Sequence, residues 1–176
     1  MKKKINNGAI PQATNRQLLE KINEADMQEE SISAQEDLVK FVVFEIDNIQ
    51  FALPGDVVQE IILDREIYYL PFTPPYIRGL INRHGEPYTV IDVKILFKKE
   101  KLEASKFIII RDKVDKLSLL ITEITKIINV HKNEIKNITS KNENRDYFTS
   151  SVTIEESEIL VIDISRIMKK ISNDIE

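Results

Sequence analysis

Residues 70–93 read LPFTPPYIRGLINRHGEPYTVIDV and carry the strongest structural signal in the chain. Three prolines, Pro71, Pro74 and Pro75, hold the first part extended, and the aromatic residues beside them suit a stiff binding surface. Two apolar, β-rich runs follow, 76–84 and 87–93. This pattern predicts two β-strands joined by a tight turn.

Similar short apolar runs recur along most of the chain and predict further strands. Turn-forming residues separate them, and Asp47-Asn48 predicts a two-residue hairpin turn. The regular spacing favours an all-β barrel or sandwich. The other predicted strands are 41–46, 49–53, 106–111, 117–122, 124–130, 147–153 and 159–164.

A short helix is predicted before the proline-rich stretch. Asp56 followed by Gln59 resembles a capping box, in which each side chain accepts a hydrogen bond from an exposed backbone N–H. The interval 57–63 is therefore expected to form two helical turns, with Glu60 on the outer side.

Two aspartates occupy similar places in the sequence. Residues 88–93 and 159–164 each end in Ile-Asp followed by an apolar residue, and an amphipathic segment comes next. The repeat suggests two similar small barrels, with Asp92 and Asp163 each capping a short helix. The alternative reading is a small hydrolase that uses these two carboxylates.

Other enzyme classes find little support. The two histidines, His84 and His131, lack a Gly-x-Ser-x-Gly motif, and the four glycines form no phosphate-binding loop. The absence of cysteine excludes disulfides and Cys-based zinc sites. We therefore expect no catalytic residue, no metal and no cofactor.

Composition limits the choice of partners and compartment. The net charge is −4, and acidic and basic residues are interspersed, so no basic surface for binding nucleic acid is expected. No run of residues resembles a signal peptide or a membrane span. We therefore expect a cytoplasmic protein without direct membrane insertion. Residues 1–36 are polar and are interpreted as a flexible N-terminal extension. A docking helix carrying Leu18, Leu19 and Ile22 is the alternative.

Three blocks of sequence resemble the CheW domain: 57–61, 70–82 and 85–93. The resemblance runs over residues 38–97 and continues collinearly over 106–171, so a CheW-like domain is expected at 37–174. It implies an all-β fold with short helices, in which two intertwined five-stranded SH3-like β-barrels share a core. It also implies a chemotaxis scaffold without catalytic activity, located in the cytoplasm at membrane-associated receptor arrays.

The resemblance further implies two protein partners. The regulatory domain of a CheA-type histidine kinase is expected on the first barrel, and the cytoplasmic tips of methyl-accepting chemoreceptors are expected in an apolar groove between the barrels. The kinase-binding residues implied are Val58, Glu60, Arg78, Gly79, Asn82, Arg83, His84 and Gly85. The receptor-binding residues implied are Leu119, Ile121 and Ile124.

The sequence departs from the family pattern at one turn. His84 stands where the family usually has an arginine that pairs with the glutamate matching Glu60. The sequence predicts a weaker, pH-dependent His84–Glu60 pair, with a solvent-facing His84 as the alternative. The adjacent Arg83 could replace His84 in the pair only if the turn rearranges, because neighbouring strand residues point to opposite faces. Such changes would also fit a specialised coupling protein for a non-chemotactic receptor and kinase pathway.

Overall fold

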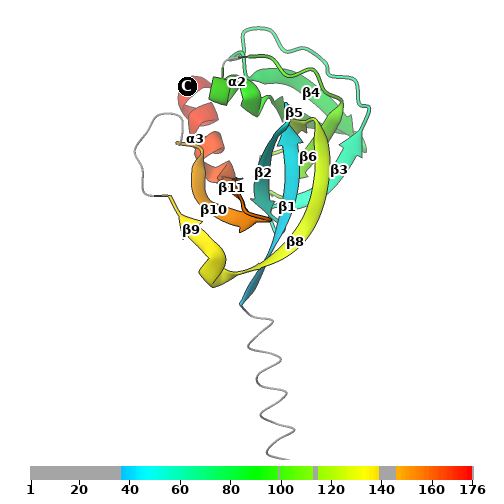
Figure 1. Cartoon of the computed structure of the whole chain (residues 1–176). Coiled ribbons are helices and arrows are strands. Elements are labelled where there is room, and N and C mark those ends of the chain that lie inside the picture. Colours follow the sequence, from blue (N-terminus) through cyan, green and yellow to red (C-terminus); the bar gives the residue numbers. More distant parts are fainter. Residues whose placement is uncertain (1–36, 99, 113–114, 139–145, 176) are drawn as a thin grey trace, which may run out of the picture. The chain divides into compact units, whose positions relative to one another are not determined.

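The computed structural model describes residues 37–98, 100–112, 115–138 and 146–175. The N-terminal extension expected at 1–36 lies outside these residues. The described part of the chain consists mainly of two β-sheets, which confirms the predicted all-β class (Figure 1).

The sheet that we call the first barrel has the strand order β3-β6-β7-β5-β4. Backbone hydrogen bonds of 2.7 and 2.8 Å between Tyr68 and Leu80 connect the segment after β3 to β4 and bring the two outer strands of this sheet together. Its strands are β3 (Val58–Leu63), β4 (Ile77–Arg83), β5 (Glu86–Ile91), β6 (Lys106–Ile110) and β7 (Leu117–Ile121).

The sheet that we call the second barrel has the order β8-β1-β2-β11-β10-β9. The short helix η1 (Lys132–Glu134) joins β8 directly to β9, the two outer strands. The three-residue β9 is an addition to the five strands expected. The strands are β1 (Leu38–Ile46), β2 (Ile49–Pro54), β8 (Glu123–His131), β9 (Ile135–Asn137), β10 (Phe148–Ile154) and β11 (Ser157–Ile162).

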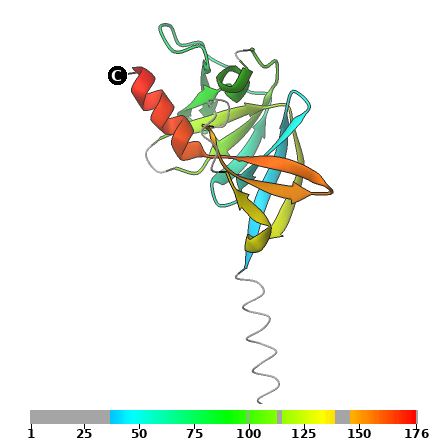
Figure 2. The ribbon, with the colours of Figure 1, turned by 60° about the vertical axis from the view of Figure 1, so that its left-hand side comes forward.

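The barrels exchange strands. β3 follows β2 in the chain but pairs with β6, and β8 follows β7 but pairs with β1. Parallel pairs hold equivalent places in both sheets, β5 with β7 and β11 with β2. Figure 2 shows the two sheets side by side, and the chain passes from one to the other twice.

Strand β1 is buried on both faces because it contributes to two cores. Val42 and Phe44 belong to the large core, which is built mostly from residues of the first barrel. Phe41 and Val43 belong to a smaller core formed by second-barrel residues. Alternate side chains of a strand point to opposite faces, so β1 links the two barrels through packing as well as hydrogen bonds.

Both predicted aspartate caps are confirmed. Asp92 Oδ1 accepts a hydrogen bond of 3.1 Å from the Lys94 N–H at the start of α2 (Val93–Lys98). Asp163 Oδ1 accepts one of 2.9 Å from the Ser165 N–H at the start of α3 (Ile164–Ile175). The Ile-Asp repeat thus marks the same structural position in both barrels.

The helix predicted over 57–63 is wrong, because these residues form strand β3 paired with β6. A half-buried strand usually alternates apolar and polar residues, but here two residues on the exposed face are also apolar. Ile61 is 38% exposed and Leu63 is 52% exposed. Tertiary pairing with β6 therefore outweighs the local capping signal.

Gly79 permits the contact between β4 and the segment after β3. Its φ is +135°, and a Cβ at this position would lie 2.2 Å from the Tyr68 carbonyl oxygen. A real Cβ cannot approach a backbone oxygen this closely, so Gly79 has a structural role.

We expect Gly79→Ala to destabilise the fold by about 2–4 kcal/mol, because the Tyr68–Leu80 bridge must open and the backbone is strained. Gly85→Ala is the matched control, since φ is +87° but no atom lies within 4 Å of the added Cβ. It should cost only about 1 kcal/mol. Urea unfolding measures both, and equal losses would contradict the steric role of Gly79.

Candidate functional site

An ion pair joins β3 and β4 of the first barrel. Arg83 Nε donates to Glu60 Oε1, and the two side chains are 17% and 31% exposed. Glu60 lies on the inward face of β3 with Val58 and Ile62, as the burial pattern of the strand shows. Arg83, the last residue of β4, therefore reaches its partner across the end of the barrel.

Tyr88 lies under this pair. The Arg83 guanidinium carbon is 5.5 Å from the centre of the Tyr88 ring, and Tyr88 is only 5% exposed. A cation over a phenol ring adds attraction to the ion pair. The hydrogen bond from Arg83 is the main reason that the pKa of Glu60 is lowered; burial opposes it, and the positive charge of Arg83 lowers the pKa further.

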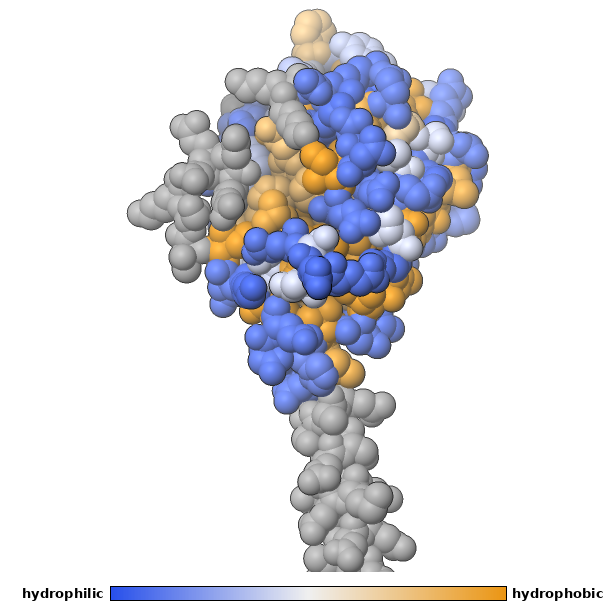
Figure 3. All heavy atoms as spheres, viewed as in Figure 1, coloured by the Kyte–Doolittle hydropathy of each residue, from blue (hydrophilic) through white to orange (hydrophobic). Residues whose placement is uncertain are grey.

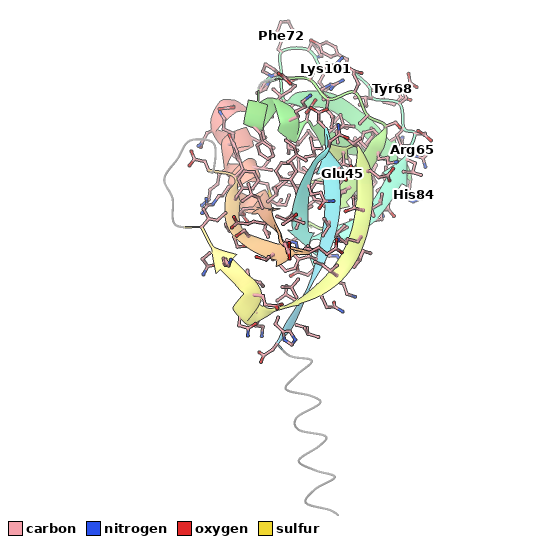
Figure 4. All side chains as sticks on the ribbon, viewed as in Figure 1. Glu45, Arg65, Tyr68, Phe72, His84 and Lys101 are labelled. Carbon is pink, nitrogen blue, oxygen red and sulfur yellow. The ribbon has the colours of Figure 1, made fainter. Side chains whose placement is uncertain are left out.

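The predicted His84–Glu60 pair is wrong, because Arg83 holds the carboxylate. His84 has a φ of 50° and begins a two-residue turn with Gly85, which takes its side chain off the strand. It is exposed beside Arg65, away from the barrel interior (Figure 4). The turn is braced by the Asn82 side-chain oxygen, which accepts a hydrogen bond of 2.9 Å from the Gly85 N–H.

Arg78 lies apart from this edge. Its Nη1 donates to Asp92 Oδ2 and to the Leu102 carbonyl oxygen, both at 2.8 Å. Arg78 and Arg83 are five residues apart on β4, or about 17 Å along the strand. Val58, Glu60, Asn82, Arg83, His84 and Gly85 thus gather at one end of the barrel, whereas Arg78 and Gly79 have structural roles elsewhere.

The implied receptor residues are mostly internal. Leu119 and Ile121 are 1% and 0% exposed within the large core, so a partner cannot reach their side chains. Ile124, at the start of β8, is partly buried against the same core. These positions do not form an accessible groove.

An apolar groove lies elsewhere, between the second barrel and helix α2. Its volume is about 270 Å³. Figure 3 shows apolar side chains gathered in a hollow between β10 and β2 beneath α2. It is lined by Ile46, Asp47, Ile49, Phe51, Lys94, Phe97, Phe148 and Leu160.

Aromatic rings form the floor of this groove. Phe97 of α2 lies 5.5 Å from Phe51 of β2 and 5.0 Å from Phe148 of β10, measured between ring centres. Sequence analysis missed these residues, since three phenylalanines from distant elements look like ordinary core residues. Only the tertiary fold brings them to one surface.

The edge strand β8 of the second barrel carries a basic residue at the position where β3 of the first barrel carries the acidic Glu60. The registers of β3 on β6 and β8 on β1 make Lys126 the counterpart of Glu60, and Ile127 that of Ile61. Lys126 pairs at 3.0 Å with Glu155 in the β10–β11 turn. Both edges therefore combine an exposed isoleucine with an ion pair to a hairpin.

The proline-rich segment divides into buried and exposed aromatic residues. Tyr76 is buried, and its hydroxyl donates to Asp174 Oδ2 of α3 at 2.8 Å. Burial and this neighbouring carboxylate raise the pKa of Tyr76. Phe72 instead has a φ of 60° and is fully exposed at the top of the loop (Figure 4).

The aspartates proposed for a hydrolase have structural roles. Asp92 is fully buried and bound to Arg78, and Asp163 caps α3; neither lines the groove. Among the described residues, no group of three His, Cys, Asp or Glu side chains is arranged to hold a metal ion. No helix in the same part of the chain is long and apolar enough to cross a membrane.

Comparisons with known proteins agree with this architecture. The model of the CheW-like domain family matches residues 40–172. The crystal structure of the scaffolding protein TtCheW from Thermoanaerobacter tengcongensis is similar, with a TM-score of 0.66 and 26% sequence identity over 71% of this chain and 88% of that chain. A search of curated proteins returned no significant match.

We expect Arg83→Met to raise the pKa of Glu60 toward its ordinary value, and His84→Ala to change it less. The folded-state pKa lies below the unfolded value, so the pair's stabilisation is present above the unfolded pKa and is lost as pH falls through the folded one. NMR titration of the Glu60 carboxyl in the three proteins measures this. A larger shift in His84→Ala would show that His84 is the main partner.

Proposed function

This chain belongs to the CheW-like domain family, and we propose that it is a non-enzymatic scaffold that couples methyl-accepting chemoreceptors to a CheA-type histidine kinase. The observation that carries the proposal is the presence of two separate surfaces on interlocked barrels: the Glu60–Arg83 edge and the apolar groove. A scaffold needs two such surfaces, because holding two partners together raises their effective concentration.

The edge of the first barrel is the proposed kinase surface. It combines the partly exposed Glu60–Arg83 pair with the exposed turn at His84 and Gly85. Exposed Ile61 adds apolar area on the neighbouring face of β3. An apolar side chain beside a well-oriented ion pair is suited to a specific protein interface. The partner that we propose for this surface is the regulatory domain of the kinase.

The groove is the proposed receptor surface. The family resemblance implies the hairpin tip of a receptor as the partner. We propose that this tip presents a helix, because a helix typically binds by laying an apolar face into an apolar groove. The groove residues replace Leu119 and Ile121 in this role, because those two side chains are buried. We propose that the protein works in the cytoplasm, at membrane-associated receptor arrays.

The direct test is affinity capture of the full-length protein from a lysate of its own cells, followed by mass spectrometry. Recovery of a CheA-type kinase together with chemoreceptors supports the proposal. Recovery of a different histidine kinase would instead indicate a specialised coupling protein. Recovery of neither under conditions that preserve arrays counts against the scaffold role.

We expect Glu60→Lys to weaken binding of the kinase regulatory domain about tenfold or more, because the reversed charge repels Arg83 and disturbs the edge. The control Glu103→Lys makes the same charge change at a side chain that is 80% exposed and lies before β6, away from the edge. This variant should bind the kinase domain normally. Calorimetry measures affinity, and thermal melting checks that both variants fold. Equal affinities would exclude Glu60 from the kinase surface.

We expect Ile49→Asp to weaken binding of a soluble receptor fragment about tenfold or more, because it places a charge in the apolar groove. Ile49 is 39% exposed, so the fold should tolerate the change. The matched control is Ile127→Asp, an exposed strand residue outside the groove. If the two variants lose the same affinity, the groove is not the receptor site.

A further inference from the structure

Two charged side chains border an otherwise apolar groove. Among its lining residues in the described part of the chain, only Asp47 and Lys94 are charged, and all the others are apolar. The two are bound to each other, with 2.8 Å between Lys94 Nζ and Asp47 Oδ2. This ion pair spans the rim of the groove.

The partners belong to different barrels. Asp47 begins the β1–β2 turn of the second barrel, with a φ of 53°, and its N–H donates to the Thr122 hydroxyl at 3.0 Å. Lys94 lies in the first turn of α2, after the first-barrel strand β5, and its N–H donates to the buried Asp92 carboxylate. Lys94 is thus fixed to the end of the first-barrel strand β5, whereas Asp47 is fixed to Thr122, at the crossover from β7 of the first barrel to β8 of the second.

One partner of the ion pair, Lys94, is largely shielded from solvent. The Lys94 side chain is 11% exposed, whereas Asp47 is 48% exposed. The hydrogen bond to Asp47 is the main reason that the pKa of Lys94 is raised, and Glu100, 3.4 Å away and itself 68% exposed, adds to it. A covered ammonium loses more water than a surface lysine, so its pairing contributes more to the geometry than a fully exposed ion pair does.

The width of the groove depends on where α2 lies against the second barrel. Phe97 of α2 faces Phe51 and Phe148 of the second barrel. A movement of α2 relative to the β1–β2 turn would therefore change the width of the groove directly.

We propose that the Asp47–Lys94 ion pair is a clasp that joins the two barrels across the rim and holds the groove at the width that receives an apolar helical segment. The proposal rests on the proposed receptor role of the groove. Pre-organisation of this kind lowers the cost of binding without adding a contact to the partner. Asp47 and Lys94 are thus positioning residues for the groove.

A charge swap distinguishes this clasp from direct contact with a partner. Asp47→Asn and Lys94→Met should each weaken binding of a soluble cytoplasmic chemoreceptor fragment about two- to fivefold, the range expected for losing a partly exposed ion pair. The double variant Asp47→Lys/Lys94→Asp, combined with Glu100→Gln to remove the carboxylate 3.4 Å from Lys94 Nζ, should recover most of the affinity. Glu103→Gln, which breaks the exposed Lys101–Glu103 pair, is the control and should have no effect.

A second measurement does not depend on the receptor. Relaxation-dispersion NMR on the free full-length protein should show new exchange at the Asn48, Ile49 and Phe97 amides in both single variants, and little in the wild type and the swap. No new exchange in the single variants would overturn the clasp. So would a swap that binds as weakly as the single variants, because Lys94 or Asp47 would then contact the partner itself.

If the wild type does not bind the receptor fragment, the proposed function fails while the exchange data still decide whether the clasp exists.

Discussion

The buried carboxylate of Asp92 fixes the junction on which the rest of the first barrel depends. Its oxygens accept hydrogen bonds from Arg78, from the Leu102 N–H at 2.9 Å and from the start of α2. A fully buried charge without such partners costs several kcal/mol, so this junction tolerates little rearrangement. Asp92 thereby sets where α2 begins, and α2 in turn places Lys94 and Phe97 at the groove.

Much of the fold could be predicted from the sequence because its signals are local. The strands, the tight turn at Asp47-Asn48 and the two aspartate caps each depend on neighbouring residues. Strand β3 could not be identified in this way, because its sequence satisfies a helix cap and its exposed face is apolar. What makes it a strand is β6, which lies more than forty residues further along the chain.

The candidate site was less predictable, for two physical reasons. Glu60 was identified, but its partner depends on a turn geometry that lifts His84 away and leaves Arg83 as the last inward residue of β4. The groove depends on strand exchange, which brings β2, β10 and α2 together from three distant parts of the chain. No local pattern distinguishes a phenylalanine beside a groove from one inside a core.

The exchange of β3 and β8 has a mechanical consequence. Separating the barrels requires breaking the ladders of β3 on β6 and of β8 on β1, together with the packing on both faces of β1. Within the described residues, the groove and the Glu60 edge are therefore connected through paired strands and a shared packed strand. A pulling force between the two surfaces would therefore load strand ladders and a packed core, and not a single connecting segment.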